Sequence, residues 1–148
     1  MPDRSILRID LDSNVFRNQD FINWLILNKE AVSAGLSVIV YLETLFWYLT
    51  KSLSVADFEL DLRTIRAVIT PLDPPLAQIT AETAKNSLLP FRHHARDFII
   101  GSSALKRKAI LLSYNSKNFT WMPEDTVTSP ESFLDKYWDS FPYHSDIS

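Results

Sequence analysis

The chain has 148 residues, of which 46% are hydrophobic and 12% aromatic, and its 18 acidic and 15 basic side chains give a net charge of −3. This composition is typical of one globular domain with a sizeable core, and it excludes a disordered chain. The slightly acidic balance excludes a global positive field that would attract nucleic acid, so any such contact needs a local basic patch or a bound metal. The absence of cysteine excludes disulfides, thiolate zinc sites and a cysteine nucleophile.

The charged residues near the start of the chain and the length of its apolar runs also limit the class of protein. Charged residues near the start of the chain, Asp3, Arg4, Arg8 and Asp10, argue against a signal peptide. The longest apolar runs are far shorter than a membrane span. We therefore expect a soluble, cytoplasmic protein without a membrane segment.

The first third of the chain predicts two strand–helix pairs. Apolar residues up to Leu11, followed by a turn-forming Asp-Ser-Asn, predict a strand over residues 5–11. An apolar stripe at helical spacing predicts a helix over residues 15–33, with Gly35 as its C-terminal cap. A second strand over residues 36–40 should then lead directly into an apolar helix over residues 41–49.

The rest of the chain continues the alternation. Ser54 and Asp57 have the spacing of a capping box, which predicts a helix ending near residue 66. The further elements that we expect are a strand at residues 67–70, a helix from Pro74 to about residue 84, a helix at 92–105, a strand at 109–113, a short strand at 125–128 and a helix at 131–139. The polar residues 140–148 are predicted to form a flexible tail.

Strands that alternate with helices predict a single α/β domain over residues 1–139. Helices would cover both faces of a mainly parallel sheet of four to five strands, which is a three-layer α/β/α architecture. In such sheets, sites form at the carboxyl ends of the strands. The residues that occupy these ends are therefore the first candidates for function.

Three acids stand near predicted strand ends in apolar surroundings. Asp12 follows the first strand, Glu43 lies just past the second, and Asp97 lies near the start of the helix that leads into the fourth. At helical spacing Asp97 shares a side with apolar residues, where a carboxylate is costly unless a cation or hydrogen bonds accompany it. Asn115 lies just past the fourth strand. We expect these residues to converge.

Converging carboxylates raise one another's pKa unless a cation compensates their charge. Hard divalent cations do so, because Mg²⁺ binds one or two carboxylates and keeps waters and substrate phosphate oxygens as its other ligands. Such ions activate a water and stabilise the attacking and leaving oxygens of a phosphodiester displacement. The pattern therefore points to metal-dependent phosphodiester chemistry.

Five motifs in this order resemble those of PIN-domain proteins. They are residues 12–16 (Asp-Ser-Asn-Val-Phe), 38–45 (Val-Ile-Val-Tyr-Leu-Glu-Thr-Leu), 96–105 (Arg-Asp-Phe-Ile-Ile-Gly-Ser-Ser-Ala-Leu), 111–119 (Leu-Leu-Ser-Tyr-Asn-Ser-Lys-Asn-Phe) and 127–133 (Val-Thr-Ser-Pro-Glu-Ser-Phe). The motif at 96–105 is the most specific of the set. Motif order, spacing and total length all agree, and the similarity runs over nearly the whole chain.

The resemblance implies a PIN-like fold and a Mg²⁺- or Mn²⁺-dependent endoribonuclease, most commonly the VapC-like toxin of a VapBC-type toxin–antitoxin pair. Carried over, Asp12, Glu43 and Asp97 would be catalytic metal ligands, with the Ser13 hydroxyl beside the first acid. Where the family often has a fourth acid, this chain has Asn115, which would position a water or a phosphate, and Asn118. The resemblance further implies an RNA substrate, a homodimer and a small antitoxin partner whose tail enters the acidic crevice with a basic residue.

Each of these residues also has a structural interpretation. Asp12 could be a helix N-cap, Glu43 a buried ion-pair partner, and Asp97 a hydrogen-bond partner of His93 one turn earlier. Asp10 is expected to pair with a basic side chain rather than join the site.

Two groups of side chains keep two interpretations open. The basic excess around the most specific motif could be a solvated face or an RNA contact; it comprises Arg92, Arg96, Lys106, Arg107, Lys108 and Lys117. The aromatic residues Phe46, Trp47 and Tyr48 favour a core or a subunit interface over a base-stacking platform.

Two other functions remain as alternatives to the ribonuclease. The neutral Asn115 and Asn118 favour an RNA- or protein-binding module of PIN-like fold with weak or no nuclease activity. A DNA flap nuclease would use a related sheet and acid cluster, but the chain is short for that class.

Overall fold

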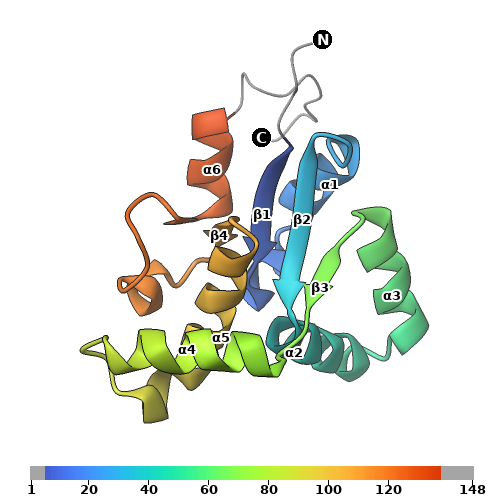
Figure 1. Cartoon of the computed structure of the whole chain (residues 1–148). Helices are drawn as coiled ribbons and strands as arrows, with labels where there is room; N and C mark the ends of the chain where they lie inside the picture. The colour runs from blue at the N-terminus through green and yellow to red at the C-terminus, as the bar shows by residue number, and fades with distance from the viewer. Residues whose placement is uncertain (1–5, 138–148) are drawn as a thin grey trace.

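The computed structural model describes residues 6–137, which fold around a five-stranded sheet (Figure 1). The strands are β1 Leu7–Leu11, β2 Val32–Ser37, β3 Val68–Thr70, β4 Ile110–Leu112 and β5 Val127–Thr128. The helices are α1 Gln19–Leu27, α2 Val38–Thr50, α3 Val55–Thr64, α4 Pro74–Lys85, α5 Phe91–Lys106 and α6 Pro130–Tyr137, with the 3-10 helices η1 Ser13–Arg17 and η2 Ser116–Phe119. The strand order is β3-β2-β1-β4-β5, and every pairing is parallel. The predicted parallel α/β architecture is confirmed.

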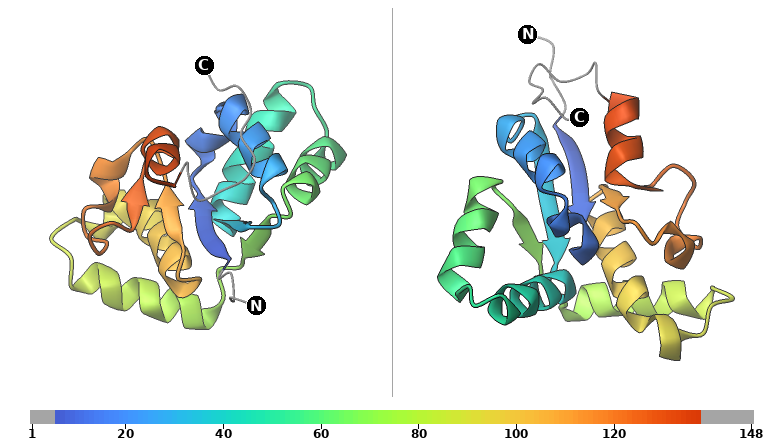
Figure 2. Two further views of the ribbon diagram at one scale, coloured as in Figure 1. Left: turned by 90° about the horizontal axis from the view of Figure 1, so that it is seen from above. Right: turned by 180° about the vertical axis from the view of Figure 1, so that it is seen from behind.

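Helices cover both faces of the sheet (Figure 2). On one face α1 and α6 pack against β1, and the rings of Trp24 and Phe133 meet at 5.8 Å. On the other face α2, α3, α5 and η2 pack around Leu36 and Leu111. α4 lies against α5. Cover on both faces is usual for a parallel sheet.

The predicted helix over residues 15–33 is wrong, because two asparagines interrupt it. The side chain of Asn18 accepts a hydrogen bond from Phe21 N at 3.0 Å and begins α1 after the short η1. Asn28 ends α1, and its side chain donates to Trp24 O at 2.9 Å. Asparagine competes with the helical ladder through such local hydrogen bonds. The chain then enters β2 at Val32, within the stretch that was expected to be helical.

The strand predicted over residues 36–40 and the capping role of Gly35 are also wrong. β2 ends at Ser37, whose hydroxyl accepts from Ile39 N at 3.1 Å and begins α2. Gly35 lies inside β2 and pairs with Asp10 of β1. A Cβ at Gly35 would collide with the Arg107 guanidinium. The glycine is therefore required for a close approach over the sheet rather than for a helix end.

The remaining elements match the predictions within a few residues. α3 begins with the expected capping box of Ser54 and Asp57, and α4 carries Pro74 in its first turn. α6 begins at Pro130, while its predicted end at residue 139 and the tail 140–148 lie outside the described residues. Between residues 6 and 137, no helix is both long and apolar enough to cross a membrane.

Candidate active site

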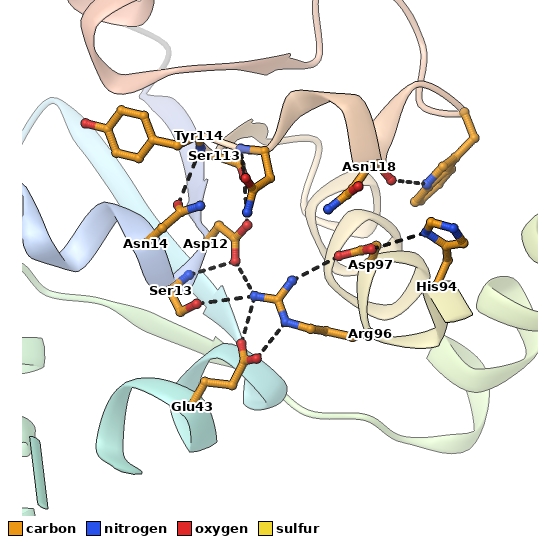
Figure 3. Close-up of polar contacts among 12 residues, drawn as sticks. Asp12, Ser13, Asn14, Glu43, His94, Arg96, Asp97, Ser113, Tyr114 and Asn118 are labelled. Atoms are coloured by element: carbon orange, nitrogen blue, oxygen red, sulfur yellow. Dashed lines mark hydrogen bonds and ion pairs between the residues drawn. The ribbon is translucent and has the colours of Figure 1, made fainter. Parts of the chain in front are cut away.

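The three acids predicted from the sequence meet at the carboxyl end of β1 (Figure 3). Asp12 directly follows β1, Glu43 projects from the second turn of α2, and Asp97 from the second turn of α5. Each comes from a different element, so only the fold brings them together. The side chains of Asp12 and Asp97 are buried, and that of Glu43 is about one-third exposed.

Asp12 is held by a dense set of donors. Its Oδ1 accepts from Ser13 N at 2.8 Å, so Asp12 does cap η1 as the structural interpretation expected. Its Oδ2 accepts from the hydroxyl of Ser113 at 2.7 Å. Both oxygens are thus oriented by neighbours, and the cap leaves the carboxylate within reach of the other acids.

The guanidinium of Arg96 lies between the three acids. Its Nε and Nη2 donate to the two oxygens of Glu43 at 2.6 and 2.8 Å, which is a bidentate pair. Nη2 also donates to Asp12 Oδ1 at 2.6 Å, and Nη1 donates to Asp97 Oδ1 at 2.9 Å. The solvated face expected as one interpretation of the basic excess is wrong for Arg96, since this side chain faces the acids. The RNA contact stays a prediction.

The acids keep Arg96 charged. Burial acts to lower the pKa of Arg96, but the hydrogen bonds and charges of Glu43 and Asp12 outweigh it and raise that pKa above its usual range. One guanidinium nevertheless faces three carboxylates.

Asp97 has a second neighbour on its own helix. His94 Nδ1 lies 3.5 Å from Asp97 Oδ2, whereas the structural interpretation of Asp97 paired it with His93. Residues three and four apart both neighbour each other on a helix, so spacing alone could not choose between the two histidines. The choice places an imidazole at the edge of the acidic cluster (Figure 3).

The loop after β4 contributes a hydroxyl that sequence reasoning missed. Ser113 follows β4 and donates to Asp12, and its hydroxyl accepts from Asn115 N at 3.0 Å. Its place at a strand end was the signal that could have found it. The side chain of Asn115 does not cap η2, and its role with a water or phosphate stays a prediction. Figure 3 shows Asn118 on the same loop, where its carbonyl accepts from Trp121 Nε1 at 3.2 Å.

Asp10 belongs to a separate ion pair, as expected. Arg107 donates to its carboxylate, to the Ile9 carbonyl at 3.1 Å and to the Ser33 hydroxyl at 3.0 Å. Burial raises the pKa of Asp10, while the charge and hydrogen bond of Arg107 oppose the rise. The space above Gly35 is what admits Arg107 to this pair.

The oxygens around Arg96 suit a hard divalent cation in kind. Carboxylates and hydroxyls are the ligands that Mg²⁺ and Mn²⁺ prefer. Among residues 6–137, no three acidic or histidine side chains are spaced to share one ion, and the Arg96 guanidinium lies between the three acids. A cation would therefore compete with Arg96 for the oxygens of Asp12, Glu43 and Asp97.

The comparisons with known proteins concern the fold. The chain matches no family model and no curated protein sequence. A toxin–antitoxin complex from Klebsiella pneumoniae contains a chain that is 18% identical, with a TM-score of 0.64 over 82% of this chain and 97% of that one. VapBC2 from Rickettsia felis, bound to a DNA fragment from their promoter, contains a chain that is also 18% identical, with a TM-score of 0.57 over 83% and 98% of the two chains.

At 18% identity, these similarities show the fold alone. They confirm the PIN-like α/β/α architecture expected from the motifs, and the resemblance to VapC-like proteins at the level of the fold. Almost the full length of each matched chain is covered, so the described elements form the whole of the shared fold. What the chain does must be argued from its own side chains.

Proposed function

We propose that this chain is a Mg²⁺- or Mn²⁺-dependent endoribonuclease and the toxin of a VapBC-type toxin–antitoxin pair. The observation that carries the proposal is the convergence of Asp12, Glu43 and Asp97 at the carboxyl end of the sheet, where all three accept hydrogen bonds from the guanidinium of Arg96. The fold shared with chains of two toxin–antitoxin structures supports it. The proposed reaction is the hydrolysis of an RNA phosphodiester.

Asp12, Glu43 and Asp97 would hold the metal ion. When bound, the ion supplies a water of lowered pKa and charge stabilisation for the oxygens of the phosphodiester. Ser13 N and the Ser113 hydroxyl fix the orientation of Asp12, which keeps its carboxylate aimed at the cluster. Asn115, in the loop after β4, would position the attacking water or the phosphate.

Arg96 would change partners during this reaction. Its guanidinium occupies the same carboxylate oxygens that an ion needs, so the two cations exclude each other there. The side chain is about one-third exposed, so it has room to swing toward solvent. A displaced guanidinium beside the site suits a phosphate, since its planar fork donates two parallel hydrogen bonds.

The test is RNA cleavage by the pure protein in Mg²⁺ or Mn²⁺, with structured and single-stranded RNAs. Asp97→Asn should lower the rate by about a hundredfold or more, since even the outer partners of metal ligands contribute about 10–100-fold. Asp135→Asn, an exposed acid on α6, is the matched control and should cleave like the wild type. Equal cleavage by wild type and Asp97→Asn would overturn the assignment.

The second candidate is an RNA- or protein-binding module of the same fold with weak or no nuclease activity. The position of Arg96 among the acids favours it, because a permanent guanidinium would neutralise part of the cluster without any metal. Calorimetric titration with Mn²⁺ separates the two functions. Binding below the millimolar range supports the nuclease, and no binding near millimolar supports the module.

We further propose a small antitoxin as the protein partner. The acids already accept a guanidinium from Arg96, so a basic residue on a partner's tail could bind them in the same way. A homodimer remains a prediction from the resemblance, and a cytoplasmic location remains a prediction from the composition. Mixing with a candidate antitoxin should abolish RNA cleavage and also prevent Mn²⁺ from binding to the acidic cluster.

A further inference from the structure

Three hollows in the surface meet at Arg17, the last residue of η1. One is lined by Asn14, Asn18 and Tyr114, and another by Gln19, Trp47 and Lys51, each together with Arg17. The third is the most relevant to the site and has a volume of about 450 Å³. It is lined by Ser13, Asn14, Arg17, Glu43, Thr44, Phe46, Trp47 and Thr50. We call this third hollow the η1–α2 groove.

The η1–α2 groove is continuous with the acidic cluster. Glu43 belongs to both, since it lines the groove and binds Arg96. Ser13 does so too, because its hydroxyl accepts from Arg96 Nη2 at 3.2 Å. A chain whose phosphate lies at the acids would therefore reach the groove with its next nucleotide.

The groove presents the rings of Phe46 and Trp47, which the core leaves exposed or partly exposed. Phe46 is 68% exposed, and Trp47 is half-buried with the Arg17 guanidinium 5.7 Å from its ring centroid. Tyr48, by contrast, is buried and donates to Asp61 at 2.6 Å. Tyr48 is thus a core residue as expected, Trp47 packs partly against the core, and Phe46 is exposed. A subunit interface, the other expectation for these aromatics, stays a prediction. Exposed aromatic rings with a nearby cation are the usual platform for single-stranded nucleic acid.

We infer that the η1–α2 groove is a binding subsite for a nucleotide of single-stranded RNA next to the scissile phosphate. The base would stack on Trp47 and Phe46, and the phosphate would meet Arg17. Asn14 and Thr50 offer polar groups to the base or the ribose. The inference rests on the proposed function and adds the place where the substrate is held.

The polar lining of the groove favours RNA over an apolar protein segment. Arg17 lines the groove and Lys51 lines a neighbouring hollow, while the acids are Glu43 in the groove and Asp20 in the hollow beside it. The amides of Asn14, Asn18 and Gln19 continue along the same surface. A surface of cations, amides and one or two aromatic rings matches a phosphate backbone with stacked bases. An apolar helix would leave these polar groups unpaired.

The test is fluorescence anisotropy with a labelled RNA octamer in EDTA, which prevents metal-dependent cleavage. Trp47→Leu should weaken RNA binding about tenfold through the loss of one stacked base. Arg17→Gln should weaken it about fivefold and reduce the salt slope by about 0.7, the value for one phosphate contact to a single strand. Phe91→Leu and Arg63→Gln, which lie outside the three hollows, are the matched controls and should bind like the wild type.

An abasic octamer with the same backbone is the second probe. Weaker binding of this probe than of RNA, with the difference removed in Trp47→Leu, supports a base subsite. Unchanged RNA affinity in both Trp47→Leu and Arg17→Gln would overturn the nucleotide subsite. A protein side chain would then be the expected occupant of the groove. Circular dichroism of each variant confirms that it is folded.

These experiments distinguish a failure of the subsite from a failure of the proposed nuclease function. Loss of RNA binding in Trp47→Leu together with no cleavage by the wild type in Mg²⁺ or Mn²⁺ would reject the nuclease and keep the subsite. Cleavage by the wild type with normal RNA binding in both groove variants would keep the nuclease and reject the subsite.

Discussion

The guanidinium of Arg96 stands between Asp12, Glu43 and Asp97 and donates to all three. Without a cation, three neighbouring carboxylates repel one another. Arg96 therefore stabilises the folded chain in the absence of metal. The same contacts compete with metal binding, so stability and metal affinity should respond to this side chain in opposite directions.

The first prediction concerns Arg96→Gln. Removing the charge should lower the free energy of unfolding in EDTA by roughly 1–3 kcal/mol, because the cluster is only partly buried and solvent screens part of the repulsion. The affinity for Mn²⁺ should rise at the same time, since no guanidinium competes for the acids. Urea denaturation in EDTA and calorimetric titration with Mn²⁺ measure the two effects.

Arg92→Gln is the control for this prediction, because Arg92 is exposed one turn before Arg96 on α5 and makes no contact with the three acids in the described structure. Arg92→Gln should change neither the free energy of unfolding in EDTA nor the affinity for Mn²⁺. An Arg96→Gln variant that binds Mn²⁺ no more tightly than the wild type would show that the guanidinium does not compete with the ion.

At the scale of single elements, α5 depends on the one glycine within it. A Cβ at Gly101 would lie 2.6 Å from Trp121 Cζ2 and 2.9 Å from Met122 Sδ. Trp121 in turn packs on Phe98 with ring centroids 5.0 Å apart. The small residue thus allows the segment after η2 to close over the helix that carries Asp97 and Arg96.

The second prediction is that Gly101→Ala destabilises the fold. Alanine should gain about 1 kcal/mol in helix propensity, but overpacking against a rigid indole costs about 1–3 kcal/mol. We expect a net loss of about 1 kcal/mol in the free energy of unfolding, measured by urea denaturation. In a Trp121→Leu background the same substitution should become neutral or stabilising, and a persisting loss would contradict the clash.

The third prediction concerns the hydrogen bond between α2 and α3. Tyr48 donates to Asp61 at 2.6 Å, and burial together with this bond raises the pKa of Tyr48. A raised pKa means that the bond contributes its stability below the unfolded-state pKa of about 10 and loses it as pH rises through the folded-state value. Tyr48→Phe should therefore cost about 1 kcal/mol at pH 7, with a smaller difference from wild type at strongly alkaline pH.

Urea denaturation of both proteins at pH 7 and above pH 10 measures this difference. Subtracting the variant from the wild type removes the contributions of the other tyrosines. A difference that stays constant across this range would contradict the raised pKa of Tyr48. A difference of zero at pH 7 would show that the Tyr48 hydroxyl contributes nothing through its hydrogen bond.

At the scale of the whole molecule, large apolar side chains remain exposed near the turn between α4 and α5. Leu88 is fully exposed and Phe91 is 53% exposed. Monomeric proteins tolerate single exposed apolar residues, whereas clusters of them mark contact surfaces. The homodimer that the resemblance implies stays a prediction, and this segment is where we expect its contact surface.

The fourth prediction is a dimer in sedimentation equilibrium at micromolar concentration. Leu88→Glu should shift the population toward monomer, because a charge at a contact surface opposes association. Leu60→Glu, on an exposed position of α3, is the matched control and should remain dimeric. A wild type that sediments as a monomer throughout would contradict the prediction.

The sequence alone determined the parallel α/β architecture and the three acids. Apolar runs, capping signals and prolines are local features, and they located most of the elements within a few residues, such as α3 at Ser54 and α4 at Pro74. Asp12 and Glu43 were predictable because they come after strands, and parallel strands end on one edge of the sheet. Asp97 was predictable from its apolar neighbours at helical spacing and from the most specific motif. The expected helix over residues 15–33 failed because local hydrogen bonds of Asn18 and Asn28 outweighed an apolar pattern that a buried strand also satisfies.

Only the tertiary structure decided which side chains accompany the acids. Arg96 looked like one of several surface cations, and Ser113 like the last residue of a strand, until the packing of α5 and β4 brought them to Asp12. Gly35 resembled a helix cap until Arg107 was seen above it. These contacts join residues far apart in the chain, and their partners are set by the packing of α2 and α5 beside β1, which no local pattern encodes.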